Sequence, residues 1–394
     1  MLRFKQLYIH TTQGYAGELA RESQFVFNYR TDDRHCEIAL AMPLRSQSYA
    51  ANILPGVLRQ NLPEGYLHFW LKEHFGKVAR MDDMSILALS GRDVIGRIRC
   101  HTEPRSDLSH AEGESLKEIL TWQGTEDLFD YLAEKYALVS GVSGIQPKVL
   151  VPEATAPAGK DVVDKATVRS KNLIVKSSGD DYPGLAENEY FCMNIARCAG
   201  LEVPEFWLSD NRKLFVVERF DYRDGSYLGF EDMTSLMNRQ TDEKYTGSYE
   251  NVAKATSIFT SPAFTTSSLE SLFRSIVLSV LVRNGDAHLK NFGLLYTHPH
   301  SEDCRLSPLY DVVNTTAYLP KDTLALKLNK TKAWPLKKDL IAFGKEYCRV
   351  DYPERIIEQI ADAAMEYRPP EVTGIWARMK PEIEIACLGM SKNA

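Results

Sequence analysis

The sequence predicts an α+β fold spread over two or three domains or lobes, and three observations support this. At 394 residues, the chain is longer than one hydrophobic core usually serves. Short runs rich in Val, Ile and Phe at residues 148–152, 172–176 and 213–220 have the composition of strands. Apolar residues at 269–282 instead repeat with the spacing of a buried helix.

Charge and hydropathy indicate a soluble, cytoplasmic protein. The net charge of −6 argues against a broad nucleic-acid footprint, because such surfaces need clustered Lys and Arg. The N-terminus lacks the apolar core of a signal peptide, and the most apolar run, residues 276–282, is too short to span a membrane. The seven cysteines are scattered without a CxxC pair, so free thiols are expected.

Residues 1–105 are expected to form a compact α/β unit. Strands are predicted at residues 7–9 and 25–27, with Gln13-Gly14 as the turn between them. A helix is predicted at residues 66–75. No reactive set of side chains stands out in this region.

The best-defined helix precedes a polar loop. Ser267 and Glu270 have the spacing of a capping box at its start, and it is expected to end at Asn284-Gly285. Its apolar residues form one continuous stripe, which predicts a largely buried helix. The stripe comprises Leu269, Leu272, Phe273, Ile276, Val277, Val280 and Leu281.

The residues after this helix carry the candidate chemistry. Asp286, His288 and Asn291 form the pattern D-x-H-x-x-N, and Asp311 closes the later segment Ser-Pro-Leu-Tyr-Asp. Phosphoryl transfer from ATP needs a carboxylate near the attacking hydroxyl and oxygen ligands for Mg²⁺. Asp286 can orient the hydroxyl and accept its proton, while Asn291 and Asp311 can bind the metal. Lys290 can offset charge on the transferred phosphoryl group.

An ordinary turn is the alternative for this loop. Asn-Gly-Asp is a common turn sequence, because Asn and Asp side chains bond the nearby backbone. A catalytic role is favoured by the buried helix directly before the loop and by Asp311 behind an apolar segment. The remaining residues that a kinase needs also occur upstream, in the right order.

A nucleotide-binding lysine is predicted at the end of the strand at residues 172–176. Lys176 can reach the α- and β-phosphates, and a carboxylate from the following helix, residues 185–199, would hold it in place. Glu187 and Glu189 both qualify, and the sequence does not choose between them. A solvated strand end is the alternative for the lysine, and helix-start carboxylates favoured by the macrodipole are the alternative for the glutamates.

Two further segments are candidates for binding the nucleotide through their backbone. The end of the strand at 213–220 can bond the adenine edge, as a hinge between lobes does, although a plain strand end is the alternative. The loop at 140–148 has two glycines and two serines whose amides can cradle phosphate oxygens, but it does not match the P-loop pattern. The candidate contacts are Val217, Glu218, Phe220, Gly144, Gln146 and Lys148.

Together these segments resemble the HipA family, the serine/threonine kinase toxins of bacterial toxin–antitoxin modules. The resemblance runs from about residue 125 to 315, and the N-terminal unit also looks like the small first subdomain of full-length members. The motifs are Ser-Gly-Ile-Gln-Pro-Lys148, Leu-Ile-Val-Lys176, Glu187-Asn-Glu-Tyr, Val-Glu-Arg-Phe-Asp221, Asn-Gly-Asp286-Ala-His-Leu-Lys-Asn291-Phe and Leu-Ser-Pro-Leu-Tyr-Asp311.

The resemblance implies a two-lobed protein-kinase-like fold with a small N-terminal α/β subdomain and a mostly helical C-terminal lobe. The expected domains are the subdomain at 1–105, a kinase N-lobe at 106–225 and a C-lobe at 226–394. The implied activity is ATP- and Mg²⁺-dependent phosphorylation of protein hydroxyls. Asp286 would be the catalytic residue, with His288 and Lys290 in the same loop.

The resemblance also implies partners and a form of regulation. The family's known targets include aminoacyl-tRNA synthetases, and a DNA-binding antitoxin usually accompanies the kinase, so any contact with DNA would be indirect. Members phosphorylate themselves on a serine in the loop before the first kinase strand. Ser143 is the better candidate here and Ser140 the other, because Gly141 occupies the first of the family's two serine positions.

Two other functions fit part of this pattern. The D-x-H-x-x-N loop also occurs in aminoglycoside and phosphatidylinositol kinases, so a small-molecule or lipid kinase is one alternative. A catalytically silent binding partner with the same fold is the other. Four intact residues, Asp286, Asn291, Asp311 and Lys176, argue against a silent protein.

Overall fold

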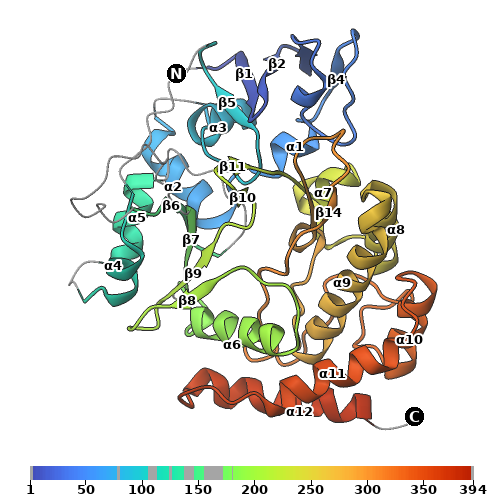
Figure 1. Cartoon of the computed structure of the whole chain (residues 1–394). Helices are drawn as coiled ribbons and strands as arrows, with labels where there is room; N and C mark the ends of the chain where they lie inside the picture. The colour runs from blue at the N-terminus through green and yellow to red at the C-terminus, as the bar shows by residue number, and fades with distance from the viewer. Residues whose placement is uncertain are drawn as a thin grey trace, which may run out of the picture. The chain divides into compact units, whose positions relative to one another are not determined.

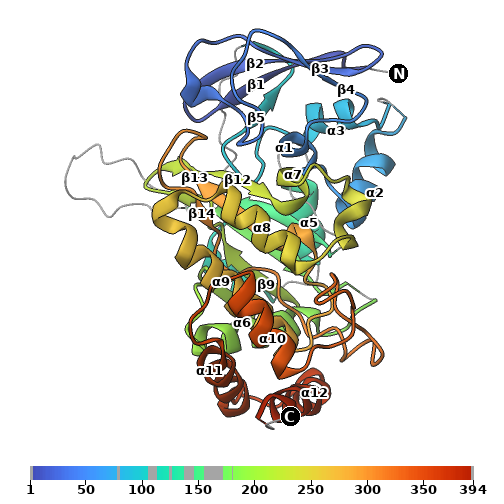
Figure 2. The same cartoon turned by 90° about the vertical axis from the view of Figure 1, so that its right-hand side faces the viewer.

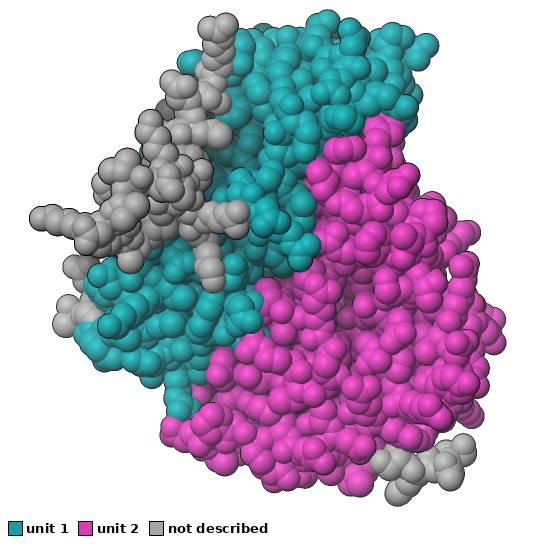
Figure 3. Space-filling model, viewed as in Figure 1, with its two compact units in different colours: residues 1–38, 42–181, 205–228 teal, residues 39–41, 182–204, 229–394 magenta. Residues whose placement is uncertain are grey.

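The computed structural model describes residues 3–77, 80–104, 113–123, 127–136, 146–154, 172–179 and 181–391. The chain divides into two compact units, which Figure 3 distinguishes by colour. Unit 1 comprises residues 1–38, 42–181 and 205–228, and unit 2 comprises residues 39–41, 182–204 and 229–394. Each unit therefore combines segments that are distant in the sequence.

A five-stranded antiparallel sheet forms the N-terminal part of unit 1 (Figure 1). Its strands lie in the order β4-β3-β2-β1-β5, and buried residues alternate with more exposed ones along β1. The strands are β1 (Gln6–Thr11), β2 (Gly14–Arg21), β3 (Phe25–Tyr29), β4 (Tyr49–Ala51) and β5 (Arg99–His101). The strands predicted at residues 7–9 and 25–27 are thus confirmed.

The prediction of a single turn between those two strands is wrong. Gly14 begins β2, which pairs with both β1 and β3. A side chain at Gly17 of this strand would overlap the carbonyl oxygen of Asn28, so close pairing with β3 requires glycine there. β2 is rich in small residues and has no β-branched ones. Its composition therefore does not predict a strand.

The N-terminal part of unit 1 also contains short helices. The helix predicted at residues 66–75 is confirmed as α2 (Gly65–Phe75). The others are η1 (Arg34–Cys36), α1 (Gly56–Arg59) and α3 (Asp83–Ser90).

A buried histidine on β5 makes the stability of unit 1 sensitive to acid. His101 is 5% exposed, and burial, together with nearby His10, Arg92 and Arg99, lowers its pKa to about 4. The unfolded chain therefore binds a proton at this histidine more readily than the folded chain does. The stability that depends on a neutral His101 is fully present above about pH 6.5 and is lost as pH falls towards 4. We expect up to about 3 kcal/mol of unfolding free energy to be lost over this range, and less in His101→Gln. Urea unfolding at pH 7 and pH 4.5 measures the difference, and equal acid sensitivity of both proteins would contradict it.

The second sheet of unit 1 has four antiparallel strands in the order β6-β7-β9-β8. They are β6 (Lys148–Pro152), β7 (Asn172–Ser177), β8 (Phe206–Leu208) and β9 (Leu214–Glu218), which confirms the three strands predicted in this region. The short pair β10 (Tyr222–Arg223) and β11 (Ser226–Tyr227) follows β9. Helices α4 (Leu116–Thr121) and α5 (Leu128–Tyr136) pack with Val149, Val151 and Val175 in one hydrophobic cluster. They therefore cover one face of this sheet.

Unit 2 is mostly helical and is built around α9 (Pro262–Leu281). This helix contacts α8 (Tyr249–Phe259), α10 (Lys337–Glu346), α11 (Pro353–Glu366) and α12 (Gly374–Ser391). Figure 2 shows α11 and α12 running beside each other at the C-terminal end. The apolar stripe predicted for α9 is confirmed, because each of its residues is at most 1% exposed.

The predicted start of this helix is wrong. The helix begins at Pro262, with Ser261 as the N-cap residue, so Ser267 lies inside it and its hydroxyl donates to the carbonyl of Phe264. Proline is favoured in the first helical turn because its missing N–H has no partner there in any case. Pro262 was therefore the stronger signal than the Ser267–Glu270 spacing.

A three-stranded sheet and several short elements complete unit 2. The sheet order is β12-β13-β14, and the helix predicted at 185–199 is confirmed as α6. The elements are α6 (Leu185–Cys198), β12 (Gly229–Asp232), α7 (Met233–Leu236), η3 (Thr241–Tyr245), η4 (Leu289–Asn291), β13 (Gly293–Tyr296) and β14 (Arg305–Leu306). All seven cysteines are free thiols, and no helix in the described ranges is long and apolar enough to cross a membrane.

Candidate active site

The C-terminal end of α9 places the polar loop. The amide of Asn284 donates to the carbonyl of Ser279, at 2.7 Å, which closes the helix with the 6→1 bond of a Schellman motif. The preceding residue, Arg283, has a φ of 57°, in the left-handed region where glycine is usual. Its carbonyl also accepts the Thr315 amide, at 3.0 Å. A buried helix and a bonded turn therefore fix where the loop begins.

Asp286 is held in this loop by contacts from three sides. Its amide donates to Asn284 Oδ1, at 3.0 Å, and the Gly285 amide donates to Thr315 Oγ1, at 2.9 Å. A side chain at Gly285 would overlap the carboxylate of Asp322. The half-buried carboxylate of Asp286 accepts the hydroxyl of Tyr245, at 2.7 Å. The loop is thus packed on its backbone and oriented at its side chain.

His288, two residues after Asp286, is buried and is expected to be neutral at physiological pH. It is 8% exposed, and burial, aided by Lys244 and Lys290 against the opposing effect of Asp311, lowers its pKa to about 3. Its ring meets the Tyr245 ring edge-on, with centroids 5.0 Å apart. Near pH 7 the ring is therefore expected to be neutral, and it packs against Tyr245.

Asn291 and Asp311 are brought together, as the sequence predicted. Asn291 Nδ2 donates to Asp311 Oδ2 at 3.2 Å, and its Oδ1 accepts the His288 amide at 3.1 Å. The hydroxyl of Tyr310 donates to the carbonyl of Lys290 at 2.7 Å, which ties the Asp311 segment to the loop a second time. Asp311 has a φ of 61°, a conformation that costs a non-glycine residue about 1–2 kcal/mol and that often occurs at functional sites.

These two side chains fit a magnesium ion by their chemistry. An amide oxygen and a carboxylate are the hard ligands that Mg²⁺ prefers, and this ion normally keeps waters and binds substrate phosphates besides one or two protein ligands. No group of three or more His, Cys, Asp or Glu side chains able to hold a metal occurs in the described part of the chain. Any ion here would therefore complete its coordination with water and phosphate oxygens.

In unit 1, the structure brings Lys148 and Lys176 together. They are directly opposite each other on β6 and β7, and they are 8% and 4% exposed. Directly opposed residues lie on the same face of a sheet, so the two candidate nucleotide lysines are neighbours. Gln146 Nε2 donates to the Ser177 carbonyl at 3.2 Å, which places this side chain at the same end of the sheet.

The remaining nucleotide candidates of unit 1 follow the same sheet. Val217 pairs with Ile174 and lies on β9 beside β7. Glu218 ends β9 and is half-buried, as is Phe220 beyond it. Ser140, Ser143 and Gly144 lie outside the described residues.

Helix α6 carries the two candidate glutamates within unit 2, and burial separates them. Glu189 is fully buried, whereas Glu187 is half-buried. Between them, Asn188 bonds Asn314 twice: Nδ2 donates to the Asn314 carbonyl at 2.9 Å, and Oδ1 accepts the Asn314 amide at 2.7 Å. Both asparagines are fully buried. The pair thus couples α6 to the segment that follows Asp311.

Sequence reasoning missed the residues that hold the site in place. Tyr310 stands next to Asp311 in the motif already identified, so its position was a usable signal. Tyr245, Thr315 and Asn314 reach the site only through the tertiary fold, and their sequence neighbourhoods carry no motif.

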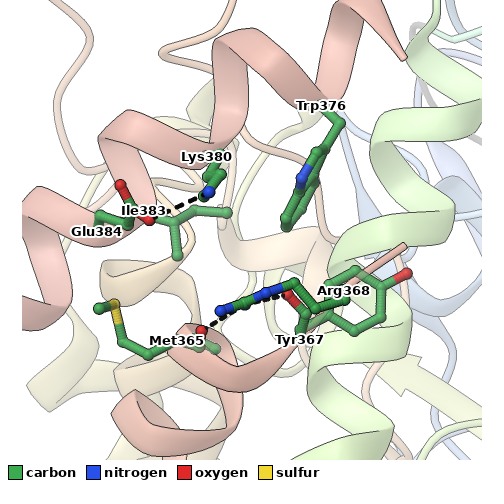
Figure 4. Close-up of a pocket in the computed structure, with 8 residues that line it drawn as sticks. Met365, Tyr367, Arg368, Trp376, Lys380, Ile383 and Glu384 are labelled. Carbon is green, nitrogen blue, oxygen red and sulfur yellow. Dashed lines mark hydrogen bonds and ion pairs between the residues drawn. The ribbon is translucent and has the colours of Figure 1, made fainter. Parts of the chain in front are cut away.

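A surface pocket elsewhere in unit 2 does not belong to this site. Figure 4 shows it between α11 and α12, lined by Tyr367, Arg368 and Trp376 among others. Arg368 already donates to the carbonyls of Met365 and Tyr367. Its guanidinium is therefore engaged within the chain rather than directed at a ligand.

Comparisons with known proteins agree with this geometry. Residues 7–101 match the HipA N-terminal domain, and residues 140–367 match the HipA-like C-terminal domain. A Sinorhizobium fredii protein named as a candidate kinase, Y4dM, is 27% identical over 351 residues, 85% of this chain and 79% of that protein. A Haemophilus influenzae protein, also named as a candidate kinase, is 32% identical over 193 residues, 45% of this chain and 53% of that protein.

A solved structure shows the same fold. The Shewanella oneidensis HipA, determined as a toxin–antitoxin complex with HipB and operator DNA, superposes with a TM-score of 0.69. The two chains are 19% identical, and the match covers 97% of this chain and 96% of that one. The two-lobed mixed fold expected from the sequence is thereby confirmed. The match to the HipA-like C-terminal domain alone covers more than half of this chain. The chain therefore belongs to the HipA family.

Proposed function

We propose that this protein is an ATP- and Mg²⁺-dependent serine/threonine protein kinase that acts as a growth-arresting toxin. The observation that carries the proposal is that Asp286 and Asn291 share one packed loop of unit 2, to which the Asp311 segment is bonded. Rigid placement of a carboxylate and of metal ligands is most of what phosphoryl transfer asks of a protein. Membership of the HipA family favours a protein substrate over a small molecule or lipid.

In the proposed reaction, Asp286 accepts a hydrogen bond from the substrate serine or threonine hydroxyl. A bond forms between that oxygen and the γ-phosphorus, the bond from the γ-phosphorus to the β,γ-bridging oxygen breaks, and the hydroxyl proton passes to Asp286 as ADP leaves. Lys290 lies in the same loop and offsets charge on the transferring group. When bound by Asn291 and Asp311, Mg²⁺ supplies charge neutralisation for the phosphates.

The nucleotide is proposed to bind through unit 1. The opposed lysines Lys148 and Lys176 supply positive charge for the phosphates, and the end of β9 supplies backbone groups for adenine. Glu187 and Glu189 both stay candidates for the carboxylate that the nucleotide lysine requires.

The proposed substrate is a translation component in the cytoplasm, such as an aminoacyl-tRNA synthetase. A DNA-binding antitoxin is the proposed partner, by analogy with the HipB of the Shewanella oneidensis complex. The net charge of −6 fits a chain that contacts DNA only through that partner.

Phosphate incorporation tests this function. Purified protein incubated with labelled ATP and Mg²⁺ is expected to label itself on Ser143 or, failing that, on Ser140. Mass spectrometry locates the site, and Ser143→Ala with Ser140→Ala as its counterpart separates the two. No label on this chain, together with no label on any protein of a bacterial lysate, would contradict the kinase assignment.

A further inference from the structure

Tyr245 contacts the proposed catalytic carboxylate directly. Its hydroxyl donates to Asp286 Oδ1 at 2.7 Å, across 41 positions of sequence. We infer that Tyr245 is a positioning residue, whose phenol fixes the rotation of the Asp286 carboxylate so that the other oxygen faces the substrate hydroxyl. The inference rests on the kinase activity proposed above and deepens it.

The tyrosine is itself fixed at its ring and at its backbone. The ring meets the buried His288 ring edge-on at 5.0 Å, and the ammonium of Lys244 lies 5.6 Å from the Tyr245 ring centroid. Lys332 Nζ donates to the Tyr245 carbonyl at 3.1 Å. Because ring and carbonyl are both in contact, the hydroxyl has a defined position from which to donate.

The orientation of the Asp286 carboxylate matters for proton transfer. The last torsion of an Asp side chain is broad and roughly two-fold, whereas proton transfer needs the accepting oxygen within hydrogen-bond reach of the hydroxyl. A charged acceptor makes the bond from a phenol shorter and stronger than a neutral pair. One oxygen is thereby occupied by Tyr245, and Oδ2 is the oxygen assigned to the substrate.

An alternative role for the same contact predicts the opposite effect on the rate. The phenol could occupy the place of the substrate hydroxyl and would then have to leave before reaction. The edge-on contact with the His288 ring and the Lys332 bond to the Tyr245 carbonyl argue for a tyrosine fixed in place. Removing the hydroxyl should slow a positioned site and should accelerate a blocked one.

Tyr245→Phe tests this, because it keeps the ring on His288 and deletes only the donor. We expect kcat for phosphate incorporation to fall about 10-fold or more, with KM for ATP unchanged. Tyr249→Phe is the matched control: its hydroxyl donates to the Ala287 carbonyl at 3.0 Å, so it touches the same loop without touching Asp286. The control should lower the urea midpoint while changing kcat little. An unchanged or raised kcat in Tyr245→Phe, or a loss confined to KM for ATP, overturns the inference.

A double-mutant cycle tests the coupling of Tyr245 and Asp286 without an activity measurement. In urea unfolding, Tyr245→Phe should lower the midpoint of the wild-type protein and change it little in an Asp286→Ala background, because the acceptor is already gone. Equal shifts in both backgrounds overturn the inference. If the wild-type protein transfers no phosphate, the proposed function fails, while the cycle still reports whether the two side chains are coupled.

Discussion

Asp286→Asn is expected to lower phosphoryl transfer about 10²- to 10⁴-fold, the range that a positioned general base contributes. Asparagine has the shape of aspartate and keeps an oxygen that can accept the Tyr245 hydroxyl. It cannot take the proton from a substrate hydroxyl at neutral pH. The loop should therefore stay in place while the chemical step slows, which single-turnover incorporation of labelled phosphate measures.

The control for this variant is Asp303→Asn, the same substitution at another carboxylate of unit 2. Asp303 accepts the amide and hydroxyl of Thr297 in a surface turn, so its loss should affect that turn and leave the transfer rate unchanged. ATP affinity should be similar in both variants. Transfer by Asp286→Asn within a few-fold of the wild-type rate would remove Asp286 from the role of proton acceptor.

Local signals in the sequence were enough to place several strands and helices and to single out the candidate site residues. The three strands of the second sheet and the buried stripe of α9 follow from composition and spacing, which act over a few residues. Asp286, Asn291 and Asp311 were identified because they belong to short motifs. The structure adds that Asn291 and Asp311 meet at 3.2 Å.

What the sequence did not predict depends on contacts between distant segments. Tyr245 reaches Asp286 only because η3 packs against the loop 41 positions later. The start of α9 was misplaced because two cap signals competed and the proline prevailed. β2 was overlooked because Gly17 is required by the close approach of the β3 backbone. No local sequence pattern reveals that contact.

The segment between Val217 and Phe220 has a structural role that its motif did not indicate. It was assigned to adenine binding from its order along the chain. The structure shows that Arg219 inside it is fully buried and bonds Asp221, at 3.0 and 2.8 Å, and Asp93, at 2.8 Å. The guanidinium also donates to the Val94 carbonyl. This side chain therefore joins the turn before β5 to the end of β9.

Replacing Arg219 with methionine is expected to destabilise unit 1 by about 3–5 kcal/mol, the usual result of removing one partner of a buried ion pair. Burial by itself disfavours the charged guanidinium, but the carboxylates of Asp221 and Asp93 outweigh it and hold the pKa of Arg219 above its ordinary value. Without the arginine, Asp221 stays fully buried, with the Gly96 amide as a donor. Urea unfolding, with hydrogen exchange on β9 to report unit 1 separately, measures the loss.

The matched comparison is Arg30→Met, which breaks an ion pair with Glu18 on the same unit. That pair has side-chain exposures of 55% and 26%, so water and salt screen it and its loss should cost about 1 kcal/mol or less. Removing both members of the buried pair, in Arg219→Met with Asp221→Leu, should cost less than Arg219→Met alone, because no uncompensated charge remains inside. Equal effects of the buried and exposed substitutions would mean that Arg219 is dispensable for joining the turn before β5 to the end of β9.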